Sequence, residues 1–242
     1  MKLLLTLFAL LLAPAAGATC RDTTFEDSPF TVCQAAITDD LRLFLNGPDG
    51  PYAGFSALQA DLGDTGQTLS FAMNAGMYQP DLSPVGLYIE DGKQLTPLIT
   101  SDGPGNFGLL PNGVFCIGKL RFSVIESRAF AAKRPKCRYA TQSGPMLVIA
   151  GALHPLFKPN SDSLNIRNGV GVSADGKTAF FAISNSRVNF ARFARMFRDQ
   201  LGTPDALYFD GSISRILAPD LGRSGAGFAI GPIVGVVIPK AR

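Results

Sequence analysis

Three times along the chain, two β-rich segments flank a short turn that contains glycine. The turns are Asp91-Gly92-Lys93, Gly118-Lys119 and Asp175-Gly176-Lys177. Glycine is favoured in such turns because tight hairpins often require a positive φ, which other residues adopt only at a cost. Hairpin turns join strands that run in opposite directions, so three of them predict a mainly antiparallel sheet.

Helical spacing of apolar residues is clearest after Asn189. This residue is a good N-cap, and apolar residues follow it at helical spacing until Gly202 and Pro204 end the helix. A shorter helix is expected over about 56–62, and a buried strand over 206–210. No linker divides the chain. The expected fold class is α+β: a single domain in which a few helices pack on a mostly antiparallel, twisted sheet.

The first residues have the composition of a secretory signal peptide. A positive start at Met1-Lys2 precedes an apolar run over 3–13 and the small residues Ala16-Gly17-Ala18. The run is shorter than the roughly 20 apolar residues that a retained membrane anchor needs. We therefore expect a signal peptide over 1–18, cleavage near Ala18, and a periplasmic or secreted domain over 19–242 with its core at about 41–239.

Two other kinds of membrane attachment are less favoured. A lipoprotein site at Cys20 normally carries Leu three positions upstream, where this chain has Gly17. The most apolar later stretch, 228–238, is interrupted by two glycines and a proline and is too short to span a bilayer. The mature chain is therefore expected not to insert into a membrane.

The chain contains four cysteines. They are Cys20, Cys33, Cys116 and Cys137. In an exported protein an even set of cysteines normally forms disulfides, and four thiols allow three connectivities. Local pairing, first with second and third with fourth, is favoured because each pair encloses a short segment between expected strand ends. No CxxC spacing occurs and His154 is the single histidine, so no zinc site or other cofactor is expected. Bound calcium is left open.

The charge balance argues against a nucleic-acid-binding protein. Lys and Arg number 22 and Asp and Glu 19, a net charge of +3 that predicts no strongly basic face. Among the acidic residues only Glu26, Glu90 and Glu126 are glutamates. Carboxylate chemistry in this chain is therefore expected to depend on Asp. The oligomeric state stays undetermined.

Two familiar motif patterns are matched in the wrong context. Residues 171–178 fit a nucleotide-binding P-loop, but Asp175-Gly176 reads as a hairpin turn and a β-rich segment follows where a helix is required. Residues 103–108 fit the dinucleotide pattern GxGxxG, yet Pro111 and Gly113 follow closely, so a loop without a helix is expected. A Ser-His-Asp triad is also disfavoured, because it would have to use His154 beside a proline.

Four segments place small and polar residues where strands are expected to end. They are 74–78, 141–146, 165–171 and 208–215. Side chains at strand ends leave the core and can meet at a common rim, which is where binding and catalytic groups gather. The Asn-x-Gly and Asp-Gly sequences in these segments are also common in ordinary turns, so turn formation alone could explain them. These segments supply most of the candidate site residues.

The order of these segments resembles the phosphodiester glycosidase family, an uncovering-enzyme-like domain, in its bacterial exported branch. The matching motifs are Asn-Ala-Gly-Met-Tyr at 74–78, Ser-Gly-Pro-Met-Leu at 143–147, Arg-Asn-Gly-Val-Gly-Val at 167–172 and Tyr-Phe-Asp-Gly-Ser at 208–212. The likeness covers about 41–239. Two motifs depart from the family pattern: Ala75 and Ile213 stand where the family often has glycine.

The resemblance implies an exported glycosidase that hydrolyses the bond between a sugar anomeric carbon and a phosphodiester. Positive character then develops at the sugar and negative charge on the departing phosphate. Arg167 is expected to clamp the phosphate through its planar fork, and Asp210 to act at the sugar as nucleophile, base or electrostatic partner. Arg167→Ala is expected to slow turnover about a hundredfold and to leave folding intact. The expected substrate-binding residues are Asn74, Gly76, Asn106, Ser143, Gly144, Asn168, Gly211 and Ser212.

Two other functions fit the same residues. A non-catalytic periplasmic protein could use the rim to bind a glycan or a phosphate-bearing polymer, and the altered loop at 210–214 favours this alternative. A serine hydrolase would make Ser143 a nucleophile, which is not expected. The natural substrate and the stereochemical outcome do not follow from the sequence.

Overall fold

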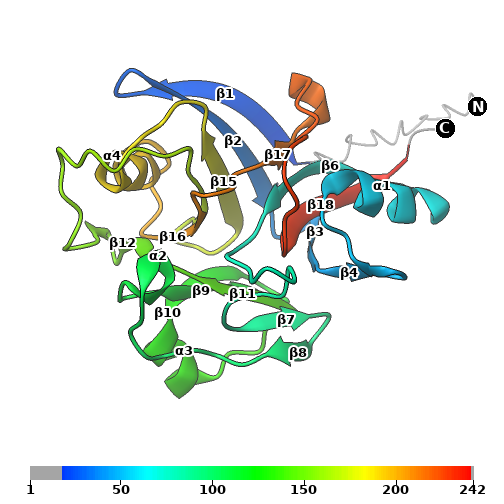
Figure 1. The fold of residues 1–242 in the computed structure, drawn as a ribbon, viewed down its shortest axis with the longest axis horizontal. Helices are drawn as coiled ribbons and strands as arrows, with labels where there is room; N and C mark the ends of the chain where they lie inside the picture. The colour runs from blue at the N-terminus through cyan, green and yellow to red at the C-terminus, as the bar shows by residue number, and fades with distance from the viewer. Residues whose placement is uncertain (1–17, 241–242) are drawn as a thin grey trace, which may run out of the picture.

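Residues 18–240 form three antiparallel sheets around one core in the computed structural model (Figure 1). The largest sheet has seven strands. In spatial order they are β1 (Thr19–Phe25), β2 (Ser28–Ala36), β15 (Thr178–Ser184), β14 (Asn168–Val172), β16 (Asp205–Asp210), β12 (Met146–Ile149) and β13 (Ala152–Leu153). The expected signal peptide lies outside the described residues except for Ala18.

The two other main sheets are smaller. The five-stranded sheet contains β10 (Phe122–Glu126), β9 (Gly113–Ile117), β11 (Tyr139–Ser143), β7 (Tyr88–Glu90) and β8 (Lys93–Thr96). The four-stranded sheet contains β17 (Ile216–Leu217), β6 (Gln67–Asn74), β18 (Ile233–Pro239) and β3 (Asp40–Phe44). A short ribbon of β4 (Asn46–Gly47) and β5 (Gly50–Pro51) stands apart.

The three hairpins expected from the sequence are present. β7 pairs with β8 across Asp91-Gly92, and β14 pairs with β15 across a turn in which Gly176 has a φ of 72°. The turn between β9 and β10 is longer than expected: the amide of Gly118 donates to the carbonyl of Arg121 at 3.0 Å, so β10 begins at Phe122. The hairpin at Asp175-Gly176 confirms that residues 171–178 are not a P-loop.

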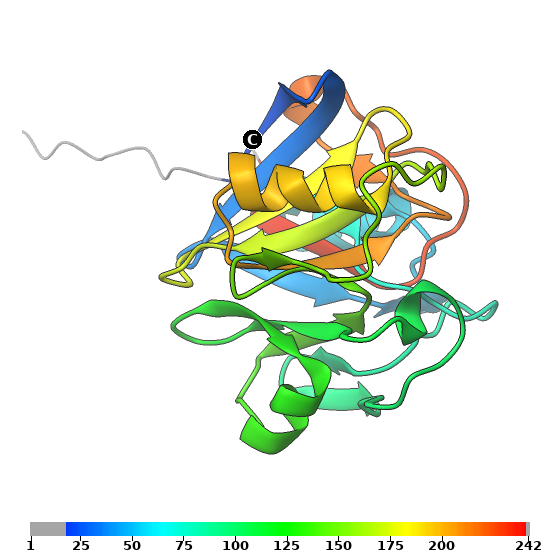
Figure 2. The same ribbon diagram turned by 90° about the vertical axis from the view of Figure 1, so that its left-hand side faces the viewer.

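One helix covers the outer face of each sheet (Figures 1 and 2). The helix capped by Asn189 is α4 (Phe190–Arg195), which continues as a π-helical turn over Met196–Gln200 and lies across the seven-stranded sheet. The other two are α1 (Phe55–Asp64), on the four-stranded sheet, and α3 (Ser127–Lys133), on the five-stranded sheet. This arrangement confirms the expected α+β class.

Two further helical turns lie in loops. They are the single turn α2 (Gly105–Gly108) and a 3₁₀ turn over Pro219–Leu221. The sequence led us to expect a helix-free loop at 103–108, so α2 is a correction. With four residues, α2 is shorter than the helix that a dinucleotide-binding motif requires.

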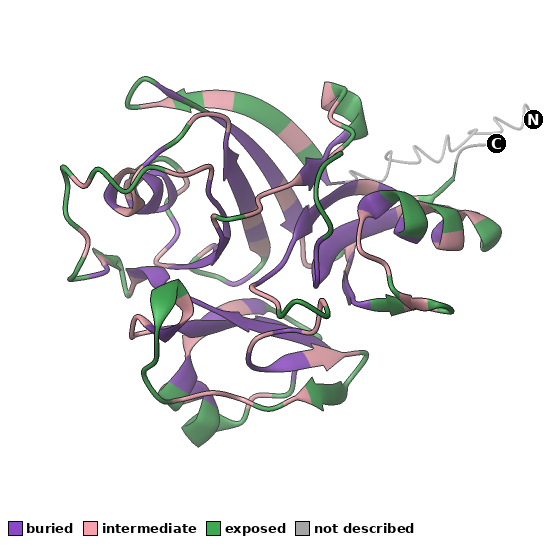
Figure 3. Ribbon diagram, in the orientation of Figure 1, coloured by how far each residue is buried: buried purple, intermediate pink, exposed green. Residues whose placement is uncertain are grey.

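The inner faces of all three sheets meet in one apolar core. Phe71 of β6, Phe115 of β9 and Phe181 of β15 come from three different sheets, and their ring centroids lie 5.3 Å (Phe71 to Phe181) and 5.8 Å (Phe115 to Phe181) apart. Buried strands surround this centre, and the helices expose their outer faces (Figure 3). Contact among aromatic rings of three sheets fixes how the strand ends are placed relative to one another.

Two disulfides close locally. Cys20 is bonded to Cys33 and Cys116 to Cys137, which is the favoured connectivity of the three. Within residues 18–240, none of the helices has the length and apolar content that crossing a bilayer would require.

Candidate active site

Three strand ends from two sheets meet at one point. β6 of the four-stranded sheet ends at Asn74, whereas β14 begins at Asn168 and β16 ends at Asp210 in the seven-stranded sheet. The Asn168 side-chain amide donates to the Asn74 carbonyl at 2.8 Å and to Asn74 Oδ1 at 2.9 Å. The Asp210 amide donates to Asn168 Oδ1 at 3.1 Å. Distant segments thus meet as expected, but the two asparagine side chains are buried inside the protein and not exposed at a rim.

The two asparagines hold the loop that follows β16. Asn74 Nδ2 donates to the Ile213 carbonyl at 2.8 Å, and Asn74 Oδ1 accepts from the Arg215 amide at 2.9 Å. Both asparagine side chains are fully buried. Their hydrogen-bonding groups are thus engaged inside the protein, and in this structure they position the 210–215 loop instead of presenting amides to a substrate.

The Asp210 carboxylate is held by backbone amides. Its Oδ1 accepts from the Gly211 amide at 2.6 Å and from the Ser212 amide at 2.9 Å. Asp210 is 8% exposed, and among the described residues no Lys or Arg forms an ion pair with it. Burial raises the pKa of Asp210 above its usual value, while the amides of the following loop oppose this rise.

Arg167 is fully buried without a carboxylate partner. Its Nε donates to the Val188 carbonyl at 2.9 Å, its Nη2 to the Ser163 carbonyl at 2.9 Å and its Nη1 to the Tyr208 hydroxyl at 3.3 Å. The guanidinium carbon lies 3.6 Å from the centroid of the Phe190 ring. Burial lowers the pKa of Arg167. A buried cation that lacks a counter-charge is costly, so such a residue is a candidate for binding an anion.

This burial changes one expectation. Removing the Arg167 side chain would leave a cavity beside Phe190 and would take one of two donors from the buried Val188 carbonyl, which would keep the Asn165 amide at 3.2 Å. Each of these losses is destabilising. We therefore expect Arg167→Ala to reduce stability as well as turnover, contrary to the expectation from sequence that folding is unaffected.

The Tyr208 hydroxyl links Arg167 to the Asp210 loop. A Cβ on Gly211 would overlap the Tyr208 hydroxyl oxygen and lie 3.6 Å from Arg167 Nη1. Burial raises the pKa of Tyr208 well above its usual value, with the Asp210 charge adding to this while Arg167 and the Asn106 side chain oppose it. Arg167 and Gly211 therefore both lie against the Tyr208 hydroxyl.

Three other candidates lie beneath this cluster. The Ser143 hydroxyl is fully buried and donates to the Phe209 carbonyl at 2.9 Å, which joins β11 to β16. A Cβ on Gly144 would lie 2.6 Å from Asn112 Cβ, and one on Gly76 3.0 Å from Thr141 Oγ1. These residues allow close packing under the site, and Ser143 is not exposed as a nucleophile would need to be.

A cavity of about 370 Å³ opens beside the cluster. Gly211 and Ser212, whose amides bind Asp210, line it together with Arg187 and Arg215. Arg215 donates from Nε to the Gly225 carbonyl at 2.6 Å, whereas Arg187 is exposed and forms no ion pair with any described residue. Tyr208 and Arg215 lie within the segment 208–215 but were not expected as site residues. Arg187 lies outside all four segments, and no motif in the sequence indicated it.

The histidine and the acidic residues do not form a second centre. His154 is buried, its ring stacks on Phe157 with centroids 4.7 Å apart, and burial lowers its pKa. Its Nε2 lies 3.1 Å from the Leu110 carbonyl, not beside a serine. Within residues 18–240 no three His, Cys, Asp or Glu side chains are grouped so that they could hold a metal ion.

The chain as a whole is similar to known proteins. The sequence profile of the phosphodiester glycosidase family matches residues 67–230. An uncharacterized protein of Escherichia coli strain K12, YigE, is 35% identical over 212 residues, which cover 86% of this chain and 82% of that protein.

Two solved structures share the fold at low sequence identity. The catalytic domain of zebrafish N-acetylglucosamine-1-phosphodiester alpha-N-acetylglucosaminidase, auto-inhibited by its pro-peptide, has a TM-score of 0.59 at 14% identity over 90% of this chain and 81% of its own. A hypothetical protein from Synechocystis has a TM-score of 0.58 at 13% identity. The match covers 91% of this chain but 62% of the Synechocystis chain.

Proposed function

Because the chain belongs to the phosphodiester glycosidase family, we propose that it hydrolyses the bond between a sugar anomeric carbon and a phosphodiester. One observation carries the assignment of residues: the buried, uncompensated guanidinium of Arg167 donates to the Tyr208 hydroxyl, and Gly211, which follows the buried carboxyl group of Asp210, packs against the same hydroxyl. The reaction needs one group for each developing charge, since the sugar becomes positive as the phosphate leaves with negative charge.

In this proposal Asp210 acts at the sugar. Its carboxylate is oriented by the amides of Gly211 and Ser212, two residues that line the cavity, so it needs little reorganisation during the reaction. Asn74 and Asn168 are positioning residues that fix the 210–215 loop. A phosphate leaving group is a weak base, so it requires little proton donation, and a single carboxyl group suffices. Whether Asp210 serves as nucleophile, base or electrostatic partner is set by where the sugar lies.

Arg167 binds the phosphate in the same proposal. Its Nη2 now donates to the carbonyl of Ser163, in an exposed segment between β13 and β14. A phosphate oxygen takes the place of this carbonyl when that segment moves aside, and the remaining bonds to Val188 and Tyr208 keep the fork in place. Arg187 and Arg215 line the adjacent cavity and add positive charge where the rest of the phosphodiester lies.

Export is part of the proposal. Two disulfides are expected to persist only in an oxidising compartment, and the first 18 residues have the pattern of a signal peptide. The protein would then meet its substrate in the periplasm or outside the cell.

A non-catalytic binding protein is the second candidate. Ile213 stands where the family often has glycine, and it packs against the apolar cluster beneath α1. A larger residue in the loop that positions Asp210 would be tolerated if the site only holds a glycan or phosphate-bearing ligand.

Release of free sugar separates the two functions. The purified mature chain, with its disulfides formed, is incubated with a panel of sugar-1-phosphodiesters that begins with N-acetylglucosamine-1-phosphodiester, the substrate in the name of the zebrafish relative. Appearance of reducing sugar supports the glycosidase. Saturable binding without sugar release favours the binding protein, and neither binding nor release across the panel contradicts both.

A further inference from the structure

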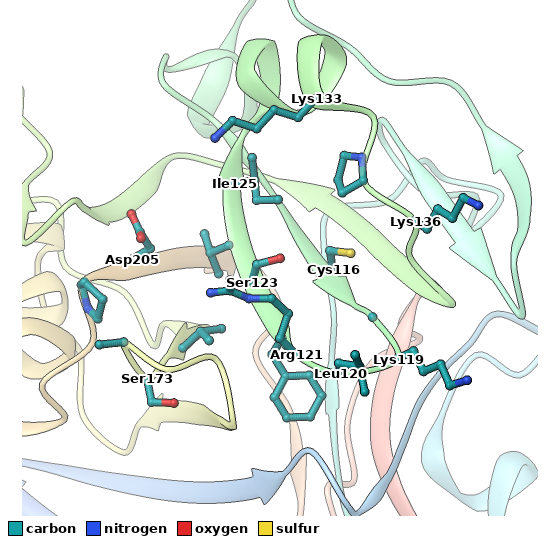
Figure 4. A pocket seen from close by; sticks show the side chains of 17 residues that line it. Cys116, Lys119, Leu120, Arg121, Ser123, Ile125, Lys133, Lys136, Ser173 and Asp205 are labelled. Carbon is teal, nitrogen blue, oxygen red and sulfur yellow. The ribbon is translucent and has the colours of Figure 1, made fainter.

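A second cavity, of about 530 Å³, lies at the opposite ends of the strands that form the candidate active site. β14 runs from Asn168 in the active site to Val172 in this cavity, and β16 runs from Asp205 in the cavity to Asp210 in the active site. The four residue steps of β14 span about 13 Å and the five of β16 about 17 Å. The cavity, here called the basic groove, is therefore a separate place on the molecule (Figure 4).

Four cationic side chains line the basic groove. They are Lys119, Arg121, Lys133 and Lys136. All four are exposed, and within residues 18–240 none forms an ion pair or a side-chain hydrogen bond with the protein. Their charges are thus available to a ligand.

Positive charge is concentrated in this part of the chain. Residues 118–138 contain seven Lys or Arg and one Glu, whereas the whole chain has 22 basic and 19 acidic residues. The remainder of the chain therefore has more acidic than basic residues. One carboxylate, that of Asp205, lines the groove, and its Oδ1 accepts from the Ala150 amide at 3.0 Å instead of pairing with a lysine or arginine.

The segments that carry these cations are held in place. The Cys116–Cys137 disulfide joins β9 to the segment next to Lys136. The Phe122 amide donates to the Gly176 carbonyl at 2.8 Å, and Lys177 Nζ donates to the Leu120 carbonyl at 2.7 Å, so the β9–β10 turn is fastened to the β14–β15 turn. The backbone of the groove is thus held in place before a ligand binds, so the entropy cost of binding is mainly that of ordering the cationic side chains.

We propose that the basic groove binds a small ligand that carries several phosphate groups. The Arg121 fork suits two oxygens of one phosphate, and lysine ammonium groups act as point charges for the others. Figure 4 shows Arg121 and Lys133 extending toward the Asp205 side of the groove and Lys119 and Lys136 toward the other side, so the positive charges are distributed along it. A volume of about 530 Å³ is in the range of small-molecule sites. A ligand with a single charge would engage only part of this set.

Calorimetric titration of the mature protein with tripolyphosphate tests the proposal. We expect one tripolyphosphate per groove, bound at least tenfold more tightly than inorganic phosphate, with an affinity that falls between 50 and 200 mM NaCl because exposed charges are screened. The double variant Arg121→Gln/Lys133→Gln should weaken binding at least tenfold. The matched control Lys93→Gln/Lys158→Gln removes two exposed cations outside the groove and should bind like the parent.

Three outcomes would overturn the proposal. The first is no binding of tripolyphosphate, and the second is equal weakening in both double variants, which would indicate non-specific attraction. The third is binding to vesicles of anionic lipid that is lost in Leu120→Ser, without tripolyphosphate binding, because Leu120 is 71% exposed at the tip of the turn. Asp210→Asn should retain tripolyphosphate binding, so failure of the groove and failure of the glycosidase proposal are distinguishable.

Discussion

Charged side chains are buried at one end of β14 and β16 and exposed at the other end. At the Asp210 end, a carboxyl group and the guanidinium of Arg167 are buried and bonded to backbone groups and a phenol. At the Asp205 end, four cations stand in solvent without partners. Burial shifts a pKa and fixes a geometry, which suits chemistry, whereas exposed charges attract ions at a strength that salt reduces.

The largest expected effect comes from the buried carboxyl. Asp210→Asn keeps an oxygen for the Gly211 and Ser212 amides but removes the charge, so we expect sugar release to fall by about a thousandfold or more. The measurement is the initial rate of reducing-sugar release at saturating substrate. Asp199→Asn, at an exposed carboxylate paired with Arg198, is the control and should keep the parental rate. A fully active Asp210→Asn would exclude Asp210 from the reaction.

The second effect tests the buried cation. Arg167→Lys keeps the charge but loses the planar fork, so we expect turnover to fall about a hundredfold. Arg167→Ala should in addition lower the free energy of unfolding by about 2–5 kcal/mol, because a cavity remains beside Phe190 and the buried Val188 carbonyl loses a donor. The two readouts are turnover and urea denaturation.

Arg198→Lys, at an exposed ion pair, provides the comparison for Arg167. It should alter neither turnover nor stability measurably, as is usual for surface pairs. If Arg167→Lys also leaves turnover unchanged, the guanidinium has only a structural role.

The third effect comes from the close approach of Gly211 to Tyr208. Gly211→Ala would place a methyl group on the Tyr208 hydroxyl, so we expect a loss of about 1–3 kcal/mol in stability and a tenfold or larger loss in turnover. Tyr208→Phe removes the obstructing oxygen. The double variant should therefore recover most of the stability lost in Gly211→Ala, as measured in a double-mutant cycle. Independent, additive losses would show that the two residues do not constrain each other.

Local chemistry made much of the fold predictable from sequence. The turns at Asp91-Gly92 and Asp175-Gly176 and the N-cap at Asn189 each depend on residues close in the chain, and all three are present. The helix α3 was missed because its cap is Glu126, whose carboxylate accepts from the Arg128 and Ala129 amides. Glutamate is not among the residues that usually signal a helix start.

Burial at the site was not predictable in the same way. The order of the motifs predicted that Asn74, Asn168 and Asp210 lie close together. No residue near Arg167 in the sequence indicates that Phe190 of α4 covers its side chain. That contact depends on how a helix packs on a sheet formed from distant strands. The balance of charge over the whole chain likewise concealed the basic segment at 118–138, since acidic residues elsewhere offset it.

The smallest effect is a pH dependence of stability that separates buried from exposed carboxyl groups. The pKa of Asp210 is raised in the folded protein, so the folded state holds this proton more tightly than the unfolded chain does. Stability therefore falls as the pH rises from the ordinary pKa of an aspartate to the raised pKa of Asp210. Asp210→Asn removes this cost and should melt above the parent at pH 7, with the difference in melting temperature closing toward pH 4. The pKa of Asp199 is lowered instead, by the hydrogen bond from Arg198, so Asp199→Asn should show no gain at pH 7. Thermal melts of the parent and both variants from pH 4 to pH 7 measure how each difference in melting temperature changes with pH. If Asp210→Asn differs from the parent by the same amount at every pH, the charge of Asp210 is not destabilising.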